Sequence, residues 1–447
     1  MQSVRDGLIH DATSLFRFVD SIDRFIAEHE TQFTYNDATE SFFRYLRIKT
    51  DETKSVVFQV LENEAQSSLD DGLRYRRELT IQKDRWKIRH TYIKPAADAH
   101  TLNIPAPLIK MAESDLREIS QTGHAEVVVL LTPELMYFAE RPNDPLLKGT
   151  VFLEIPYSQA SGFFGNLTIY HELGHFMWDK LLEEKPTRPA FAALIDGLEK
   201  VFDSKLSMRV QDPVNRNWIR RSYDAWTQEL FCDLFAIRHV GPAASFALID
   251  ILSLFGLMQD ENEVTFKEKH PAPALRLREQ LQRLQADGWW QCMDDLRSEH
   301  VNLTNRLAAV DPTEYKFAHA DAELPWQIVE SFLEVVPLIQ LLAIDVTSDV
   351  QARSADFREW RSSLEDCLVN GIVPSKLLEI GAASPTPVSM INAAYCVYLA
   401  RLPELMSKLE GQDVAKPDHR QTWIERLEDW TMKGIDDYYL LAGCKGI

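Results

Sequence analysis

Residues 163–182 have the sequence FFGNLTIYHELGHFMWDKLL, and this stretch decides how the rest of the chain is interpreted. Its apolar residues recur at helical spacing, so the stretch is predicted to be helical. His171 and His175 are four residues apart, and side chains at that spacing lie one turn above each other on the same helix face. Both imidazoles can therefore point at a single cation.

Glu172 directly follows the first of these histidines. From that position its carboxylate can take a proton from a metal-bound water and later deliver one to a leaving amine. The pattern HExxH is typical of a metal-assisted hydrolase, and zinc is the expected metal. The structural alternative is a helix that carries two surface histidines and a glutamate by chance. A third ligand would weigh against that alternative.

A catalytic zinc needs a third protein ligand, and the compact continuation HExxHxxGxxH fails because residue 181 is leucine. The predicted helix at 215–240 holds Glu229 and Asp233 four residues apart among apolar residues. A buried carboxylate is costly unless it is paired or bound to a metal. Glu229 can be the third ligand, with Asp233 accepting a hydrogen bond from a ligand histidine. Two alternatives stay open: both acids face solvent, or Cys232 supplies the ligand.

A resemblance to known peptidases rests on three short segments. HELGH at 171–175 and ELFCD at 229–233 resemble the gluzincin pattern HExxH…ExxxD, which implies that Glu229 ligates zinc and Asp233 orients a ligand histidine. The segment HPAPALR at 270–276 is similar to the HPxxxxR signature of the CAAX prenyl protease family and its soluble relatives. By this resemblance His270 stabilises the oxyanion and Arg276 is structural. Alternatively, His270 merely ends a loop before a helix that opens at proline.

Tyr223 and a predicted strand complete the candidate site. Tyr223 could donate a hydrogen bond to an oxyanion, although a tyrosine on a helix more often packs half-buried. The runs AEVVVLL at 125–131 and VFLEI at 151–155 predict strands, and the turn-forming residues between them would let the two strands pair. As an edge strand, 151–155 could bind an extended peptide by strand addition.

Charge and composition restrict the expected partners and compartment. A formal net charge of −20 disfavours binding to nucleic acid or to an anionic membrane surface. The odd number of five cysteines without a CxxC pair, and an N-terminus without an apolar signal segment, predict a cytoplasmic protein. The most apolar stretch, 335–344, is about half the ~20 residues of a membrane span, so it is predicted to be a core helix.

The predicted fold class is mainly α-helical (α+β), with a zincin-like metallopeptidase core and a small sheet. The predicted regions are a helical N-terminal region at 1–122, the catalytic core at 123–290 and a helical C-terminal region at 291–447. Within the core, Gly241-Pro242 should end the helix at 215–240. The sheet should precede the HExxH helix in the chain, and the helices at 1–122 and 291–447 should flank the core.

The sequence thus predicts a zinc-dependent peptidase that hydrolyses peptide bonds through a metal-bound water, with Glu172 as general base. The expected partners are a peptide or protein substrate and, for the helical flanks, a further protein. The alternative is a regulatory or partner-binding protein with a structural or vestigial zinc site, in which a protein ligand would fill the metal's fourth position. Hydrolysis of a non-peptide amide is a third hypothesis.

Overall fold

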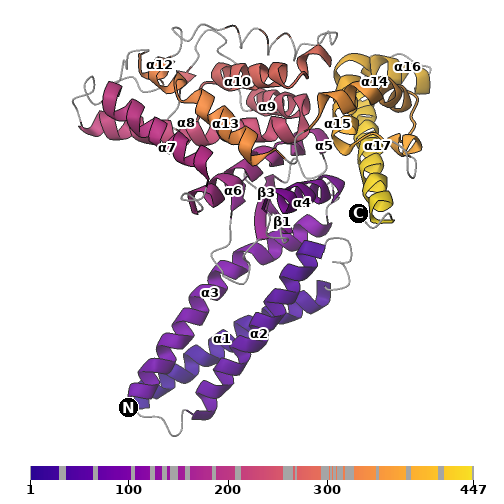
Figure 1. The fold of residues 1–447 in the computed structure, drawn as a ribbon. Helices are drawn as coiled ribbons and strands as arrows, with labels where there is room; N and C mark the ends of the chain where they lie inside the picture. The colour runs from indigo at the N-terminus through magenta and orange to yellow at the C-terminus, as the bar shows by residue number, and fades with distance from the viewer. Residues whose placement is uncertain are drawn as a thin grey trace. The chain divides into compact units, whose positions relative to one another are not determined.

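The computed structural model of the chain contains two compact units, and each unit is assembled from segments that are separate in the sequence (Figure 1). The first unit comprises Met1–Ala106, Glu126–Phe138 and Pro142–Ser161, and the second comprises Pro107–Ala125, Ala139–Arg141 and Gly162–Ile447. The structure describes residues 2–29, 37–63, 69–101, 106–120, 126–132, 138–140, 150–156, 162–183, 188–206, 213–254, 265–266, 269–292, 302, 305, 309, 316–317, 327–348, 352–378, 384–410 and 417–444.

Three long helices dominate the first unit: α1 (Gln2–His29), α2 (Asp37–Asn63) and α3 (Leu69–Thr101). They pack against one another because apolar side chains recur at helical spacing and form a shared core, as Leu8, Leu15 and Val19 of α1 do. One buried polar contact joins α3 to α2, in which the Trp86 indole N–H donates to the Thr53 hydroxyl at 2.9 Å. The helices that the sequence predicts in the N-terminal region are present as α1, α2 and α3.

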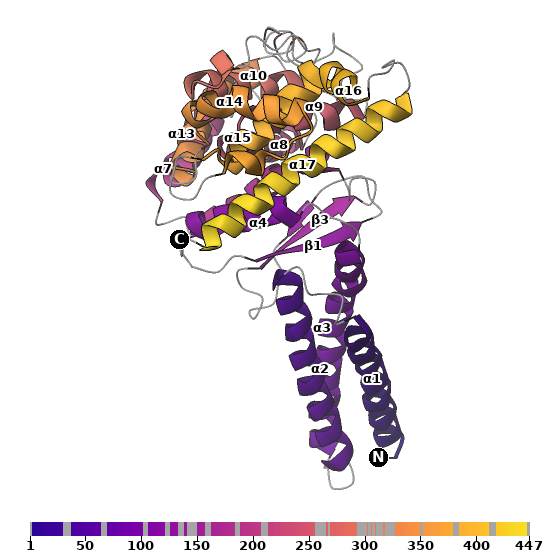
Figure 2. The same cartoon turned by 90° about the vertical axis from the view of Figure 1, so that its right-hand side faces the viewer.

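Strands β1 (Glu126–Thr132) and β3 (Thr150–Pro156) pair in parallel, with Glu126 opposite Thr150, and run side by side in Figure 2. The prediction that these two runs are neighbouring strands is confirmed. Side chains from both strands, including Phe152, belong to the same core as the three helices. With β2 (Phe138–Glu140), the strand order is β1-β3-β2. The prediction of an edge strand at 151–155 is therefore wrong, because β3 is paired on both sides.

The second unit is almost entirely helical, which confirms the mainly α-helical class. Its elements are α4 (Ala106–Ser120, of which all but Ala106 belong to this unit), α5 (Phe163–Asn166), α6 (Ile169–Glu183), α7 (Pro189–Val201), η5 (Phe202–Leu206), α8 (Pro213–Val240), α9 (Pro242–Leu254), β4 (Thr265–Phe266), α10 (Pro273–Ala286), η6 (Trp290–Cys292), β5 (Lys316–Phe317), α12 (Gln327–Leu333), α13 (Val336–Val346), α14 (Ser354–Val369), η8 (Pro374–Leu377), α15 (Pro387–Cys396), η9 (Val397–Arg401), α16 (Leu402–Glu410) and α17 (Pro417–Cys444).

Helix α8 is the central element of the second unit, since it packs against α6, α9, α10, α13 and α15. It ends where the sequence predicts, because Gly241 adopts a left-handed φ of +67° and Pro242 opens α9. A side chain at Gly241 would also meet the Trp289 ring at 3.0 Å. The predicted helix at 163–182 is instead divided into α5 and α6, with a turn at residues 167–168.

Helix α13 corresponds to the apolar stretch 335–344 and has a buried face that includes Val336, Ile339 and Leu342. It packs against α7 and α8, so its prediction as a core helix is confirmed. Among the residues that the structure describes, no helix combines the length and the apolar character that crossing a membrane requires.

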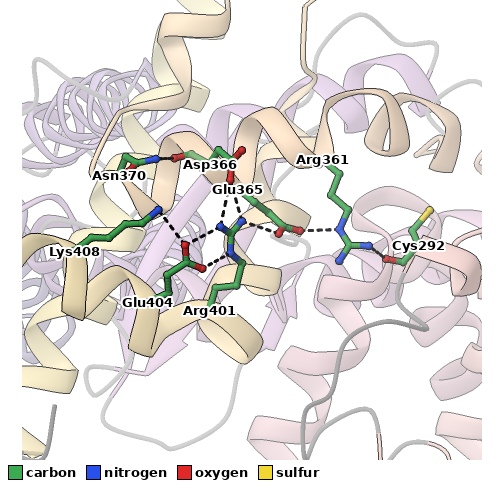
Figure 3. A network of polar contacts seen from close by, with 8 residues as sticks. All are labelled: Cys292, Arg361, Glu365, Asp366, Asn370, Arg401, Glu404 and Lys408. Carbon is green, nitrogen blue, oxygen red and sulfur yellow. Dashed lines mark hydrogen bonds and ion pairs between the residues drawn. The ribbon is translucent and has the colours of Figure 1, made fainter.

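Arg401 joins C-terminal helices through ion pairs, and Arg361 belongs to the same network (Figure 3). Arg401, at the end of η9, reaches Glu365 and Asp366 of α14 at 3.2 Å and Glu404 of α16 at 2.9 Å. Arg361 donates to the other oxygen of Glu365 at 2.7 Å. A network of this kind fixes register between helices more effectively than an isolated surface ion pair, which contributes about 0–1 kcal/mol.

Candidate metal centre

The candidate site forms where α6 crosses α8 at very short range. The crossing point is Gly174 of α6 against Cys232 of α8. A methyl group added at Gly174 would lie 2.7 Å from the Cys232 Cα and 2.9 Å from its Cβ. Only glycine permits this approach, because carbon atoms in contact are normally about 3.5–4.0 Å apart. The glycine of HELGH therefore sets the distance between the two helices that carry the candidate ligands.

His171 on α6 faces two carboxylates of α8. Its Nδ1 lies 2.9 Å from Asp233 Oδ1, and its Nε2 lies 3.4 Å from Glu229 Oε2. His175, one turn further along α6, places its Nε2 3.5 Å from Glu229 Oε1. Glu229 and Asp233 are both buried. The alternative that the two acids face solvent is thus wrong, and the structure brings both histidines and both acids together.

Helix α10 and the residues before it complete the surroundings of these carboxylates. Arg276 donates from Nε to Asp233 Oδ2 and from Nη2 to Asp233 Oδ1, both at 2.7 Å. A two-pronged bond of this kind fixes the plane of the carboxylate. His270 is about half exposed, and its Nδ1 lies 3.3 Å from Glu229 Oε2. His270 and Arg276 therefore both lie at the site, as the HPxxxxR segment predicts.

The two histidines approach the Glu229 carboxylate at a spacing compatible with zinc. With bonds of about 2.0–2.2 Å, two donor atoms on tetrahedral zinc lie about 3.3–3.6 Å apart. Oε2 of Glu229 lies 3.4 Å from His171 Nε2, and its other oxygen, Oε1, lies 3.5 Å from His175 Nε2. These distances exceed the usual 2.7–3.2 Å of an N–H···O hydrogen bond. In addition, the buried Oε2 of Glu229 has no hydrogen-bond partner in the described part of the chain. Two imidazoles and one buried carboxylate are a suitable donor set for zinc.

Cys232 competes with Glu229 for the role of third ligand. Among the described residues, His171, His175 and Cys232 form a group whose ligand atoms lie within 4.8 Å of one another. The thiol, however, is fully buried against Gly174. Burial and the nearby carboxylates raise its pKa well above the usual value. Forming the thiolate is therefore more costly than using Glu229, which is already ionised, so the geometry and the chemistry favour Glu229.

The protonation of the two histidines differs because their neighbours differ. Burial opposes a proton on His171, but its bond with Asp233 and its contact with Glu229 outweigh burial and raise its pKa to about 10. Burial and the charge on His171 lower the pKa of His175 to about 4. Burial also raises the pKa of Glu172 to about 7. Because a metal ligand must be unprotonated, metal binding would release the proton of His171.

A polar cluster on the other side of α6 was not predicted. The Tyr170 hydroxyl donates to Asp115 Oδ2 of α4 at 3.0 Å, and His239 Nδ1 of α8 lies 3.3 Å from the same oxygen. The rings of Tyr170 and His239 also stack, with centroids 5.5 Å apart. Asp115 lies 55 residues before Tyr170, so spacing in the sequence carries no signal for this contact. The cluster ties α4, α6 and α8 together beside His171.

Tyr223 lies away from these residues. Its buried ring packs against Trp226 and against Phe332 of α12, with centroids 5.7 and 5.2 Å apart. It precedes Glu229 by six residues, and at about 100° per residue the two side chains leave α8 in directions about 120° apart. The structure thus brings His171, His175, Glu229, Asp233 and His270 together. Glu172 is buried on the same helix as the two histidines and interacts electrostatically with His171 and Glu229. We assign no role to Tyr223.

Comparison with known proteins identified no relative of the chain. No family model, no curated protein and no solved structure matches the chain.

Proposed function

We propose that the chain is a zinc-dependent peptidase of the gluzincin type, with a zincin-like core in which His171, His175 and Glu229 hold the metal. The observation that carries this proposal is the 3.4 and 3.5 Å spacing between the two Nε2 atoms and the Glu229 carboxylate. It is supported by Oε2 of Glu229, which is buried and forms no hydrogen bond of ordinary geometry with the described residues, although His171, His270 and Arg276 lie 3.3–3.6 Å from it.

The catalytic roles follow from where each side chain lies. Zinc, when bound, supplies a Lewis acid that lowers the pKa of water and polarises a carbonyl group. Glu172 removes the proton of the attacking water and returns a proton to the leaving nitrogen. His270, half exposed beside Glu229, donates to the oxygen of the substrate carbonyl as charge develops there. Asp233, held by Arg276, keeps His171 in the orientation in which Nε2 faces Glu229.

The substitution Glu172→Gln tests this proposal. It keeps the shape of the side chain but removes the base, so kcat against a quenched-fluorescent peptide library should fall by about 10²–10⁴. Zinc content, measured by mass spectrometry of the dialysed protein, should stay at that of the wild type. Glu359→Gln on the exposed face of α14 is the matched control and should keep full activity. Wild-type activity in Glu172→Gln would overturn the assignment.

A second candidate is a regulatory or partner-binding protein whose zinc site is structural. The observation that favours it is the proximity of Cys232 to both histidines, because a sulfur ligand would close the position that a catalytic zinc keeps open. X-ray absorption of the zinc-loaded protein separates the two. A sulfur shell at about 2.3 Å supports the structural site, whereas a shell of nitrogen and oxygen alone supports the peptidase.

Substrate class and cellular location remain predictions. Profiling with non-peptide amides alongside the peptide library distinguishes amide hydrolysis of other kinds from peptidase activity. A cytoplasmic location is supported by Cys232, Cys292, Cys367 and Cys396, none of which forms a disulfide. The prediction that the protein binds neither nucleic acid nor membranes rests on the net charge of −20.

A further inference from the structure

The chain is strongly acidic, yet one part of α3 is strongly basic. From Arg74 to Lys94 the sequence has eight lysines and arginines but only two acidic residues, which gives a net charge of +6. The rest of the chain then has a net charge of −26. Charges of both signs are normally interspersed on the surface of a soluble protein. The cations of this run are therefore expected to pair with carboxylates, either in this chain or in a partner.

Some of these cations have partners inside the first unit. Lys83 lies 2.8 Å from Asp11 of α1, and Arg76 lies 3.7 Å from the same carboxylate. Arg89 is buried, and its guanidinium lies over the rings of Tyr45 and Trp86. These three cations are explained by packing within the helical bundle.

Three other arginines are different. Arg74, Arg77 and Arg85 are all exposed, and none of them has an ion pair within the described part of the chain. The two acidic residues of the run, Glu78 and Asp84, form no ion pair with these three arginines in the described part of the chain. Glu78 accepts a hydrogen bond from Gln82 at 3.0 Å.

The three arginines share one face of α3 with an exposed apolar residue. Positions 74, 77, 81 and 85 fall within a sector of about 80° around the helix and span about 16 Å along its axis. Residue 81 is Ile81, which is 38% exposed and lies in the middle of the sector. We call Arg74, Arg77, Ile81 and Arg85 the basic face of α3. It combines positive charge with a central apolar contact.

We propose that the basic face of α3 binds an acidic segment of a partner protein that carries an apolar residue among its carboxylates. Guanidinium groups bind carboxylates in two-pronged pairs, and Ile81 offers the apolar residue a place to bury. The charge of −26 on the rest of the chain repels long polyanions and anionic membranes, which disfavours nucleic acid and lipid as the partner. This inference does not depend on the proposed peptidase activity.

The experiment uses the full-length protein and a fluorescent peptide of about 16 residues, built from glutamate with leucine at every fourth position. Fluorescence anisotropy should show binding that weakens by about tenfold or more in the variant Arg77→Glu/Arg85→Glu. Binding by the wild type should also weaken as salt rises, because exposed charges are screened. Ile81→Ser should weaken binding of this peptide but not of a glutamate peptide without leucine.

The matched control is Arg221→Glu/Arg358→Glu, which changes the net charge equally at two exposed arginines of the second unit. It should bind the peptide as the wild type does. Circular dichroism should be the same for all variants, since the substituted side chains are exposed. Three outcomes overturn the proposal: no binding of the acidic peptide, equal weakening in the control, or tighter binding of a single-stranded oligonucleotide or of phosphatidylserine vesicles than of the peptide.

Discussion

The contact between Gly174 and Cys232 gives the sharpest prediction for the site. In Gly174→Ala the new methyl group would lie 2.7 Å from a backbone carbon of α8, which no side-chain rotation can relieve. The helices must separate by about 1 Å to restore ordinary carbon contacts. Overpacking of this kind costs about 1–3 kcal/mol, and the better helix propensity of alanine returns about 1 kcal/mol. The free energy of unfolding should therefore fall by about 0–2 kcal/mol.

The effect of Gly174→Ala on metal binding should be larger than its effect on stability. A separation of about 1 Å moves both histidine nitrogens beyond the ~3.6 Å at which they and Glu229 can share a zinc ion. Zinc affinity, measured by competition with a chelator, should fall by about 100-fold. Gly197→Ala is the control, because its methyl group would meet the end of the flexible Leu338 side chain and no backbone atom. Wild-type zinc affinity in Gly174→Ala would refute the argument.

Two further predictions concern buried charges. Burial raises the pKa of Glu428 to about 7, although Phe163 and Phe164 donate backbone N–H groups to it. Protonated Glu428 therefore contributes its full stabilisation of the folded state below pH 4.5. As the pH rises from 4.5 to about 7, this contribution falls by about 1.4 kcal/mol for each pH unit, and it is lost above pH 7. In urea denaturation, the free energy of unfolding of Glu428→Gln should therefore rise by about 3 kcal/mol relative to that of the wild type between pH 4.5 and 7.5. A difference between the two proteins that does not change with pH would contradict this. Arg276→Met leaves the buried Asp233 carboxylate without its ion-pair partner, so the free energy of unfolding should fall by about 3–5 kcal/mol. In the same urea denaturation, Arg278→Met should lower it far less.

Local structure was the most predictable part of the fold. The end of α8 at Gly241 follows from the need for a positive φ at that residue, and the strands β1 and β3 follow from runs of β-branched residues. The strand order was not predictable in the same way. Whether 151–155 is an edge or an inner strand depends on the third strand, β2, which has only three residues and too weak a pattern to be recognised.

The candidate site was predictable where its geometry is set by a single helix. The spacings of His171 to His175 and of Glu229 to Asp233 each place two groups on one helix face, and the structure confirms that the two faces meet. The same helical spacing places the side chains of Tyr223 and Glu229 about 120° apart around the axis of α8, so it would have excluded Tyr223 from the site. The bond from Arg276 to Asp233 joins different helices across 43 residues, so no helical period reveals it.

The division of the chain between the two units has a consequence for deletion experiments and for synthesis. The chain passes from the first unit to the second at residue 106 and returns at 126, before β1 and β3 are made. Phe152 of β3 belongs to the core of the three N-terminal helices, so a chain cut after residue 106 leaves that core incomplete. During translation the first unit can close only after residue 156 has left the ribosome. No single cut therefore yields either unit intact.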